Sequence, residues 1–164
     1  MMEVLAAGLD DFKTINDLAW EIWPDTYREI LTPEQLEYML DMMYSREAYT
    51  DQITRQGHYF LMVKNDGRYI GFASYELNYR KATAKLHKLY LLPDKQGLGA
   101  GKLLLGTIEE LAAQHGNYRI TLNVNRFNPA VQFYLKSGYS NLGQEDIGIG
   151  NGYFMRDFIM EKDI

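Results

Sequence analysis

Residues 89–104 read LYLLPDKQGLGAGKLL, and this stretch decides the fold. An apolar run with the character of a strand ends at Pro93, and a helical pattern of apolar residues follows the glycines. Between the two, Gly97, Gly99 and Gly101 alternate with larger residues, which allows a tight turn. The stretch therefore predicts a strand, a glycine turn and a helix in direct succession.

The glycine turn also predicts an anion-binding site. The first amides of a helix lack partners within the helix and carry positive partial charge. Glycines let a ligand approach these amides closely, so a phosphate-bearing ligand is favoured. The alternative is a connection that needs glycine for steric reasons alone, which is less natural for three glycines in five residues.

Two common nucleotide motifs do not fit this turn. A P-loop has a glycine five positions before its Gly-Lys pair and a hydroxyl residue after it, where this chain has Gln96 and Leu103. A dinucleotide fingerprint has its third glycine where Lys102 stands, and an acidic residue about 20 positions on, where the chain reads TLN. ATP, GTP, NAD and FAD are therefore disfavoured.

Periodicity on both sides of the stretch predicts the other elements. We expect a strand at 2–8, and a helix capped by Asp10 that ends at Pro24. Thr32 and Gln35 predict a capping box. The further elements are a helix from about Arg46 to Gly57, a hairpin at 58–64 and 68–77, strands at 86–92 and 119–124, a helix at 129–138 and a closing hairpin. This order describes a mixed sheet with helices on its faces.

The composition restricts the class of protein. The chain has 164 residues, a net charge of −5 and no Cys, and it opens with no signal-peptide pattern. These values predict one globular domain in the cytoplasm, without disulfides, and they disfavour nucleic acid and membranes as partners. No cluster of His, Cys and carboxylates has metal-ligand spacing, so no metal is expected.

At this point the chain resembles the GNAT superfamily of acetyl-CoA-dependent N-acetyltransferases. Residues 89–104 are similar to its central motif, a strand ending near Pro, then Gln or Arg and G-x-G-x-G/A. NPAVQFYLKSGY at 128–139 is similar to N-x-x-A-x-x-F-Y-x-K-x-G-F, with one residue fewer before Ala130. More weakly, WPDTYREILTPEQLEYML and IGNGYFMRDFIMEK are similar to bacterial polyamine acetyltransferase-like members.

The resemblance runs from about Val4 to the C-terminus. It implies an α/β (α+β) fold, with a mixed, mostly antiparallel central sheet of six to seven strands and helices on both faces. Residues 1–164 would form a single N-acetyltransferase domain, and the fold is compatible with a homodimer.

The resemblance implies acetyl-CoA as cosubstrate. The strand edge at Leu89 and Leu91 would bind the pantetheine arm, and Asn128 would contact the arm as well as, or instead of, capping a helix. The pyrophosphate would lie on the glycine turn, formed by Gln96, Gly97, Leu98, Gly99, Ala100, Gly101 and Lys102.

The resemblance also implies the catalytic residues. Tyr134 would be the general acid that protonates the leaving sulfur, against the alternative of a core aromatic beside Phe133. His87 is the candidate general base, although a lone strand histidine is more often structural, and Glu76 or water is the second choice. We expect His58 and His115 at the surface.

The acceptor is expected to be a primary amine of a small molecule, such as a polyamine, or of a peptide, between residues 23–38 and 145–153. Attack would be direct, in a ternary complex, because no Cys or activated Ser is visible. Trp20, Trp23 and Tyr27 could line a pocket, but their helical spacing predicts core packing first. The carboxylates that could attract a cation are Asp25, Glu29, Glu34, Glu145 and Asp146. The favoured alternative is that they stabilise helix dipoles or are solvated surface groups. The alternatives are a catalytically degenerate acyl-CoA sensor or interaction module, and transfer of a longer acyl group.

Overall fold

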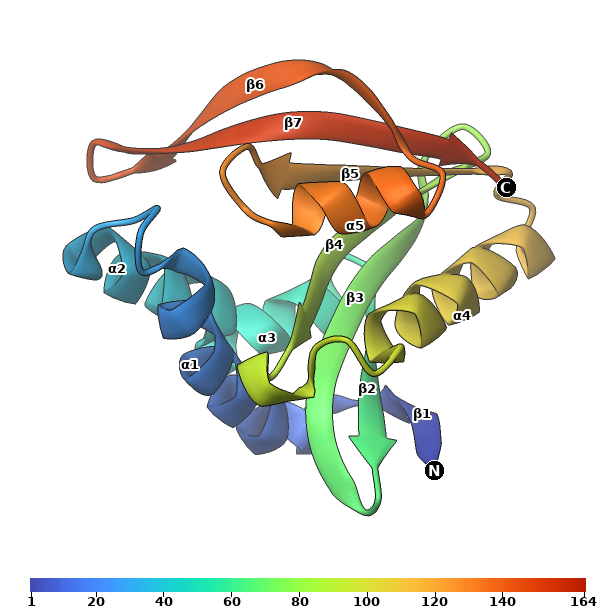
Figure 1. Ribbon diagram of the computed structural model, residues 1–164, viewed down its shortest axis with the longest axis horizontal. Helices are drawn as coiled ribbons and strands as arrows, with labels where there is room; N and C mark the ends of the chain where they lie inside the picture. The colour runs from blue at the N-terminus through green and yellow to red at the C-terminus, as the bar shows by residue number, and fades with distance from the viewer.

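A computed structural model describes residues 1–164 as one seven-stranded sheet flanked by helices (Figure 1). The strand order is β1-β2-β3-β4-β5-β7-β6, and every neighbouring pair is antiparallel except β4 and β5. The strands are β1 (Met2–Ala7), β2 (His58–Asn65), β3 (Arg68–Arg80), β4 (Thr83–Leu91), β5 (Arg119–Asn125), β6 (Ser140–Gly150) and β7 (Tyr153–Asp163). The predicted mixed, mostly antiparallel sheet is confirmed.

Helices cover both faces of the sheet, as predicted (Figure 1). The helices α1 (Phe12–Tyr27), α2 (Pro33–Tyr44) and α3 (Arg46–Thr54) lie on one face. On the other face α4 (Ala100–Gln114) packs on β3 and β4, and α5 (Ala130–Lys136) packs on β5 and β6. Two short 3-10 helices are Leu9–Asp11 and Pro93–Lys95. No helix has the length and apolar character needed to cross a bilayer.

The parallel strands β4 and β5 separate partway along their length. Residues Thr83–Leu86 pair with Arg119–Leu122, and the two strands are not paired beyond that point. Figure 1 shows β4 running down to the glycine turn while β5 continues beneath β7. The backbone of each strand is therefore left without a strand partner on one side, at the carboxyl end where α4 and α5 begin.

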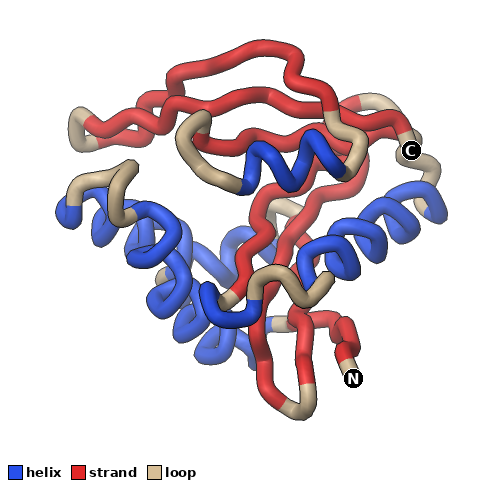
Figure 2. The backbone as a smooth tube through the Cα atoms, viewed as in Figure 1, coloured by secondary structure: helices blue, strands red, loops and turns tan.

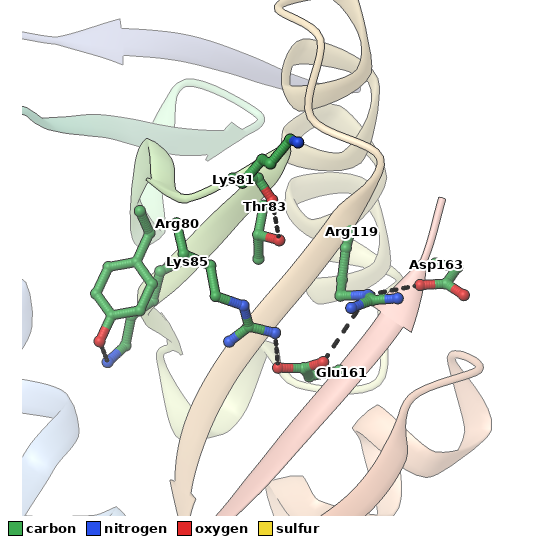
Figure 3. A network of polar contacts seen from close by, with 8 residues as sticks. Arg80, Lys81, Thr83, Lys85, Arg119, Glu161 and Asp163 are labelled. Carbon is green, nitrogen blue, oxygen red and sulfur yellow. Dashed lines mark hydrogen bonds and ion pairs between the residues drawn. The ribbon is translucent and has the colours of Figure 1, made fainter.

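Charged side chains tie the strands together at the end where β4 and β5 are paired (Figure 3). Glu161 on β7 is 11% exposed and accepts from Arg80 at the end of β3. Arg119 on β5 lies 3.9 Å from the same carboxylate and donates to Asp163 over 2.7 Å. This network holds three strands at the closed end, so the separation is confined to the other end of the strands.

A bulge in β4 changes which face His87 occupies. Lys88 pairs with Ser74 and Leu86 pairs with Tyr75, so His87 has no partner opposite it on β3. Such an extra residue re-aims its side chain relative to strict alternation. The alternation of side chains in the sequence therefore does not predict the sheet face on which the His87 side chain lies. The pairing of β3 with β4 decides it.

Three sequence predictions about helices and strands are wrong in detail. Pro24 does not end α1, because Trp23 and Tyr27 are buried on its inner face and their burial offsets the roughly 3 kcal/mol that an internal proline costs. Asp11, not Asp10, precedes α1. Strand β3 continues to Arg80 and turns directly into β4, which begins at Thr83.

The capping box at α2 is half correct. Thr32 Oγ1 accepts from the Gln35 amide over 3.2 Å, as predicted. The Gln35 side chain does not return to Thr32 but donates to the carbonyl of Phe154 over 2.9 Å. It therefore links α2 to the closing hairpin, a contact that local sequence cannot reveal.

Trp20 is also not a core residue. Its side chain is 43% exposed, whereas Trp23 and Tyr27 are buried as expected. The spacing of the three aromatic residues allows a broad apolar face on α1, and the part of that face that packs on the sheet does not include Trp20.

Candidate functional site

Two cavities meet where β4 and β5 separate. One, of about 530 Å³, extends from the glycine turn to the start of α5. The other, of about 330 Å³, lies between helices α1 and α2 and strands β4 to β7. They share lining residues at their junction, namely Leu89, Tyr90, Asn128 and Ala130.

The glycine turn presents unpartnered amides to the larger cavity. In Figure 2 the turn is the tan segment between α4 and the short 3-10 helix, Pro93–Lys95, that follows β4. The first main-chain amide after the turn that makes a hydrogen bond is that of Leu103, which donates to the Gly99 carbonyl over 3.0 Å. The amides of residues 97–102 make no hydrogen bond. Six consecutive donors at a helix N-terminus fit an anionic group, such as a diphosphate.

The glycines of the turn serve two purposes. Gly97 and Gly99 have φ of +82° and +89°, and a Cβ on either would meet no atom within 4 Å. They provide the left-handed conformation and leave open space before the amides. At Gly101 a Cβ would lie 3.4 Å from Phe133 and 3.5 Å from Leu91, which is ordinary van der Waals contact, so α4 packs on these neighbours without requiring a glycine there.

The other residues expected to bind cofactor lie around the same cavity. Gln96 and Lys102 line it, as do Leu89 and Leu91 on β4 beyond its pairing with β5. Asn128 lines both cavities, and its Oδ1 accepts from the Ala130 amide over 2.9 Å, so it also caps the start of α5. Leu98, which is 49% exposed, and the buried Ala100 are not among the lining residues of this cavity.

Tyr134 faces the smaller cavity from α5. The side chain is buried, yet its hydroxyl makes no hydrogen bond to the protein. The neighbouring Tyr27 and Tyr90 hydroxyls lie 3.0 Å apart and bond to each other. Burial, and then the nearby Tyr27, raise the pKa of Tyr134, so its phenol keeps its proton and is free to donate it.

His87 belongs to a cluster that the sequence did not predict. Its Nε2 lies 3.0 Å from Glu76 Oε1, and its ring stacks on His58 with centroids 3.9 Å apart. His58 is 8% exposed, so the prediction that it is a surface residue is wrong; His115 is exposed as predicted. Burial, followed by the charges of His58, Lys88 and Lys85, lowers the pKa of His87 to about 2. The imidazole is therefore neutral, with Nε2–H donating to Glu76.

Lys88 is the buried cation next to this cluster. Its Nζ donates to Gln52 Oε1 over 2.9 Å and lies within 5.6 Å of the ring centres of Tyr44 and Phe60. Burial lowers the pKa of Lys88 to about 7. This lysine therefore carries only part of a charge at neutral pH.

Of the five carboxylates that could attract a cation, only Glu145 lines the smaller cavity. Asp25 lines the larger cavity and pairs with Arg28, and Asp146 pairs with Arg126 and Arg156. Asp157 lines the smaller cavity but was missed. The sequence could have indicated Asp157, because it follows Tyr153 and Met155 at every second position and so shares the inward face of the strand with them.

Comparison with known proteins identifies related chains over the whole length. The model of the Acetyltransferase (GNAT) family matches residues 12–139. A spermidine N(1)-acetyltransferase of Thermoplasma acidophilum is 31% identical over 98% of this chain and 96% of its own. An uncharacterised N-acetyltransferase of Mycobacterium tuberculosis is 29% identical over 95% of this chain and 99% of its own.

Solved structures agree with this result. The PaiA N-acetyltransferase from Thermoplasma acidophilum, crystallised in complex with coenzyme A, superposes with a TM-score of 0.84 at 30% identity, covering 100% of this chain and 99% of that one. A GCN5-related N-acetyltransferase from Rhodopseudomonas palustris gives 0.83 at 20% identity, covering 99% and 95%, which is a likeness of fold alone.

Proposed function

Because the chain belongs to the GNAT family of acetyltransferases, we propose that it transfers the acetyl group of acetyl-CoA to a primary amine, with a polyamine as the favoured acceptor. The observation that carries the proposal is the row of free amides at residues 97–102, which opens into a cavity that meets a second, amine-sized one. The coenzyme A complex of one relative and the spermidine acetylation in the name of another support this assignment.

The cosubstrate is bound mainly by main-chain groups. The amides of residues 97–102 hold the diphosphate of acetyl-CoA, and Gln96 and Lys102 contact it from the ends of the turn. The pantetheine arm continues along β4 at Leu89 and Leu91, in the place where β5 would lie if the strands stayed paired, with Asn128 on its other side. The thioester then reaches the junction of the two cavities.

Transfer needs one amine proton removed and one proton given to sulfur. The neutral amine attacks the thioester carbonyl carbon, a C–N bond forms, the C–S bond breaks, and the products are an amide and the CoA thiol. Tyr134 donates the proton to the leaving sulfur, since its hydroxyl is unbonded and its raised pKa keeps it protonated at neutral pH. Tyr134 then regains a proton from the solvent.

His87 is the proposed base that takes the proton of the attacking amine. Its Nε2–H donates to Glu76, so Nδ1 carries the free lone pair, and the Glu76 carboxylate stabilises the imidazolium that would form. The lowered pKa makes His87 a weak base, so its imidazolium can form only if the Glu76 carboxylate stabilises it. Glu76 itself, or a chain of waters, is the second candidate.

Two other functions share the same cosubstrate site. A degenerate acyl-CoA sensor would bind acetyl-CoA without turnover, and an enzyme for longer acyl groups would prefer a longer thioester. The unbonded Tyr134 hydroxyl favours the enzyme, because a sensor has no need of a proton donor inside the cavity.

The test of the glycine turn is Gly99→Asp, compared with Gly116→Asp. Both glycines have positive φ with no heavy atom within 4 Å of a Cβ, and they lie at opposite ends of α4, so the two variants carry similar backbone strain. A carboxylate at 99 stands where the diphosphate is expected. Titration calorimetry should show CoA affinity weakened roughly hundredfold by Gly99→Asp and retained in Gly116→Asp.

Turnover is measured as thiol release from acetyl-CoA with a panel of amines. Release that depends on both substrates supports the transferase, and tight CoA binding without release supports the sensor. Folded Gly99→Asp protein with wild-type CoA affinity would refute the proposed diphosphate site.

A further inference from the structure

Three polar side chains form a row across the sheet, just beyond the point where β4 and β5 separate. Asn125 on β5 lies opposite Asp157 on β7, and Asp157 lies opposite Glu145 on β6. All three line the smaller cavity. One wall of this cavity is therefore acidic and is formed by three different strands.

Asp157 is a buried carboxylate that has no ion-pair partner and has one oxygen without a hydrogen bond. The residue is 6% exposed, and its Oδ1 is buried with no hydrogen bond. An ionised group in such a place costs free energy unless something compensates its charge. By contrast, Asp163 on the same strand is exposed and accepts from Arg119 over 2.7 Å.

The cations nearest to Asp157 are engaged elsewhere. Arg126 donates to Asp146 over 2.7 Å. Lys85 Nζ lies 4.6 Å from the centre of the Tyr79 ring. The protein thus supplies no ion pair for Asp157, although both cations act on it at longer range.

These neighbours do not cancel the effect of burial. Burial raises the pKa of Asp157; a hydrogen bond with Asn123 opposes this, Glu145 raises the pKa further, and Lys85 and Arg126 lower it. A cation that enters the cavity would lower the pKa of Asp157 and stabilise its ionised form.

Much of the remaining lining of the cavity is apolar. Trp23 comes from α1, and Met39, Met42 and Met43 come from α2. Ile147 and Met155 lie beside Glu145 and Asp157 on the same face of the closing hairpin. Flexible thioethers and aromatic rings adapt to a methylene chain. An alkyl chain that ends in an ammonium group therefore matches the apolar lining and the acidic row together.

We propose that Asp157, assisted by Glu145, binds the ammonium group of the acceptor that is not acetylated, and so selects diamines over monoamines. This inference rests on the proposed function. It assigns to Asp157 a specificity-determining role and leaves the proton transfers to Tyr134 and His87.

The test uses an isosteric pair of amines, 1,4-diaminobutane and n-pentylamine, which differ in a terminal amino group against a methyl group. Wild-type protein should turn over the diamine with a KM lower by about tenfold to a hundredfold, as a charge-assisted hydrogen bond predicts. Asp157→Asn should remove most of that preference by raising the diamine KM. Asp163→Asn, the same change on the same strand, is the control.

The stability of Asp157→Asn separates a role in binding from a role in structure. Because the raised pKa makes the folded state bind this proton more tightly than the unfolded state, the ionised carboxylate destabilises the fold at neutral pH. The variant should therefore unfold at the same or higher urea concentration than wild type at pH 7. Lost stability would indicate a structural role and overturn the proposal.

Equal loss of kcat/KM for both amines, or no change for either, would also overturn it. A second experiment distinguishes failure of this proposal from failure of the proposed acetyltransferase function. Protein that binds CoA but transfers nothing can still be titrated, as its CoA complex, with the two amines by calorimetry. A diamine preference that disappears in Asp157→Asn would support the site without turnover, and its absence in wild type would refute the site.

Discussion

At the scale of single residues, the candidate site depends on side chains whose hydrogen-bonding groups the protein leaves free. Tyr134 is buried in a helix like an ordinary core aromatic, yet its hydroxyl lines a cavity and has no partner. Tyr139 shows the usual arrangement, because its hydroxyl donates to Glu109 Oε2 over 2.9 Å. The Tyr134 hydroxyl is therefore open to the cavity, where a ligand can bond to it.

Tyr134→Phe removes the proposed acid and changes nothing else. We expect kcat to fall by about 10²-fold or more, the usual contribution of a positioned proton donor, while the affinity for acetyl-CoA is retained. Steady-state kinetics and calorimetry measure the two quantities. Tyr139→Phe, which loses a hydrogen bond outside both cavities, is the matched control and should keep kcat. A parallel loss of kcat and of acetyl-CoA affinity in Tyr134→Phe would indicate packing.

At the scale of elements, helix ends and strand register position the site. The N-terminus of α4 supplies the free amides, and the separation of β4 from β5 supplies the groove that leads away from them. Helix α2 forms one wall of the smaller cavity through three methionines. The helix is capped at its start by Thr32 and linked to the closing hairpin by Gln35. Its stability therefore influences the shape of that cavity.

Thr32→Ala tests the cap of α2. Loss of the hydrogen bond from the Gln35 amide should lower the free energy of unfolding by about 1 kcal/mol, within the range of 0.5 to 2 for helix caps. Urea unfolding at pH 7 measures it. Thr107→Ala removes a hydroxyl from the middle of α4, where it bonds only to the Leu103 carbonyl, and should change stability by less. Equal effects of the two changes would contradict a capping role.

At the scale of the whole molecule, the cluster of His58, Glu76, His87 and Lys88 joins β2, β3 and β4 in a largely buried layer. Burial lowers the pKa of His58 to about 4, that of His87 to about 2 and that of Lys88 to about 7. Each shift means that the folded state holds its proton less tightly than the unfolded state. The fold should therefore lose stability as the pH falls.

For the histidines, the stabilising effect is complete above pH 6.5, the unfolded value, and is lost below it as the unfolded chain takes up protons. Between pH 6.5 and 5 wild type should lose about 1 to 2 kcal/mol for each buried imidazole, as urea unfolding measures. His58→Gln should reduce this loss, with the exposed His115→Gln as control. A loss of the same size in His58→Gln would contradict the assignment.

The sequence by itself determined the glycine turn, the helix that follows it and the seven strands in order, because these depend on local chemistry: positive φ, unpaired helix amides and the alternation of apolar residues. The family was indicated by the resemblance of two motifs, and the roles of Tyr134 and Asn128 are predictions from their place in one of them. Pro24 shows the limit of such local rules, since tertiary burial of Trp23 and Tyr27 carries the helix past it.

Only the tertiary structure decided what surrounds each candidate. The bulge in β4 brings His87 against Glu76 and His58, whose neighbours in the chain give no sign of contact. Register across β5, β7 and β6 aligns Asn125, Asp157 and Glu145 on one wall. The physical reason is that burial and partners, which set a pKa or leave a carboxylate unpaired, arise from residues far apart in sequence and exist only once the strands pair.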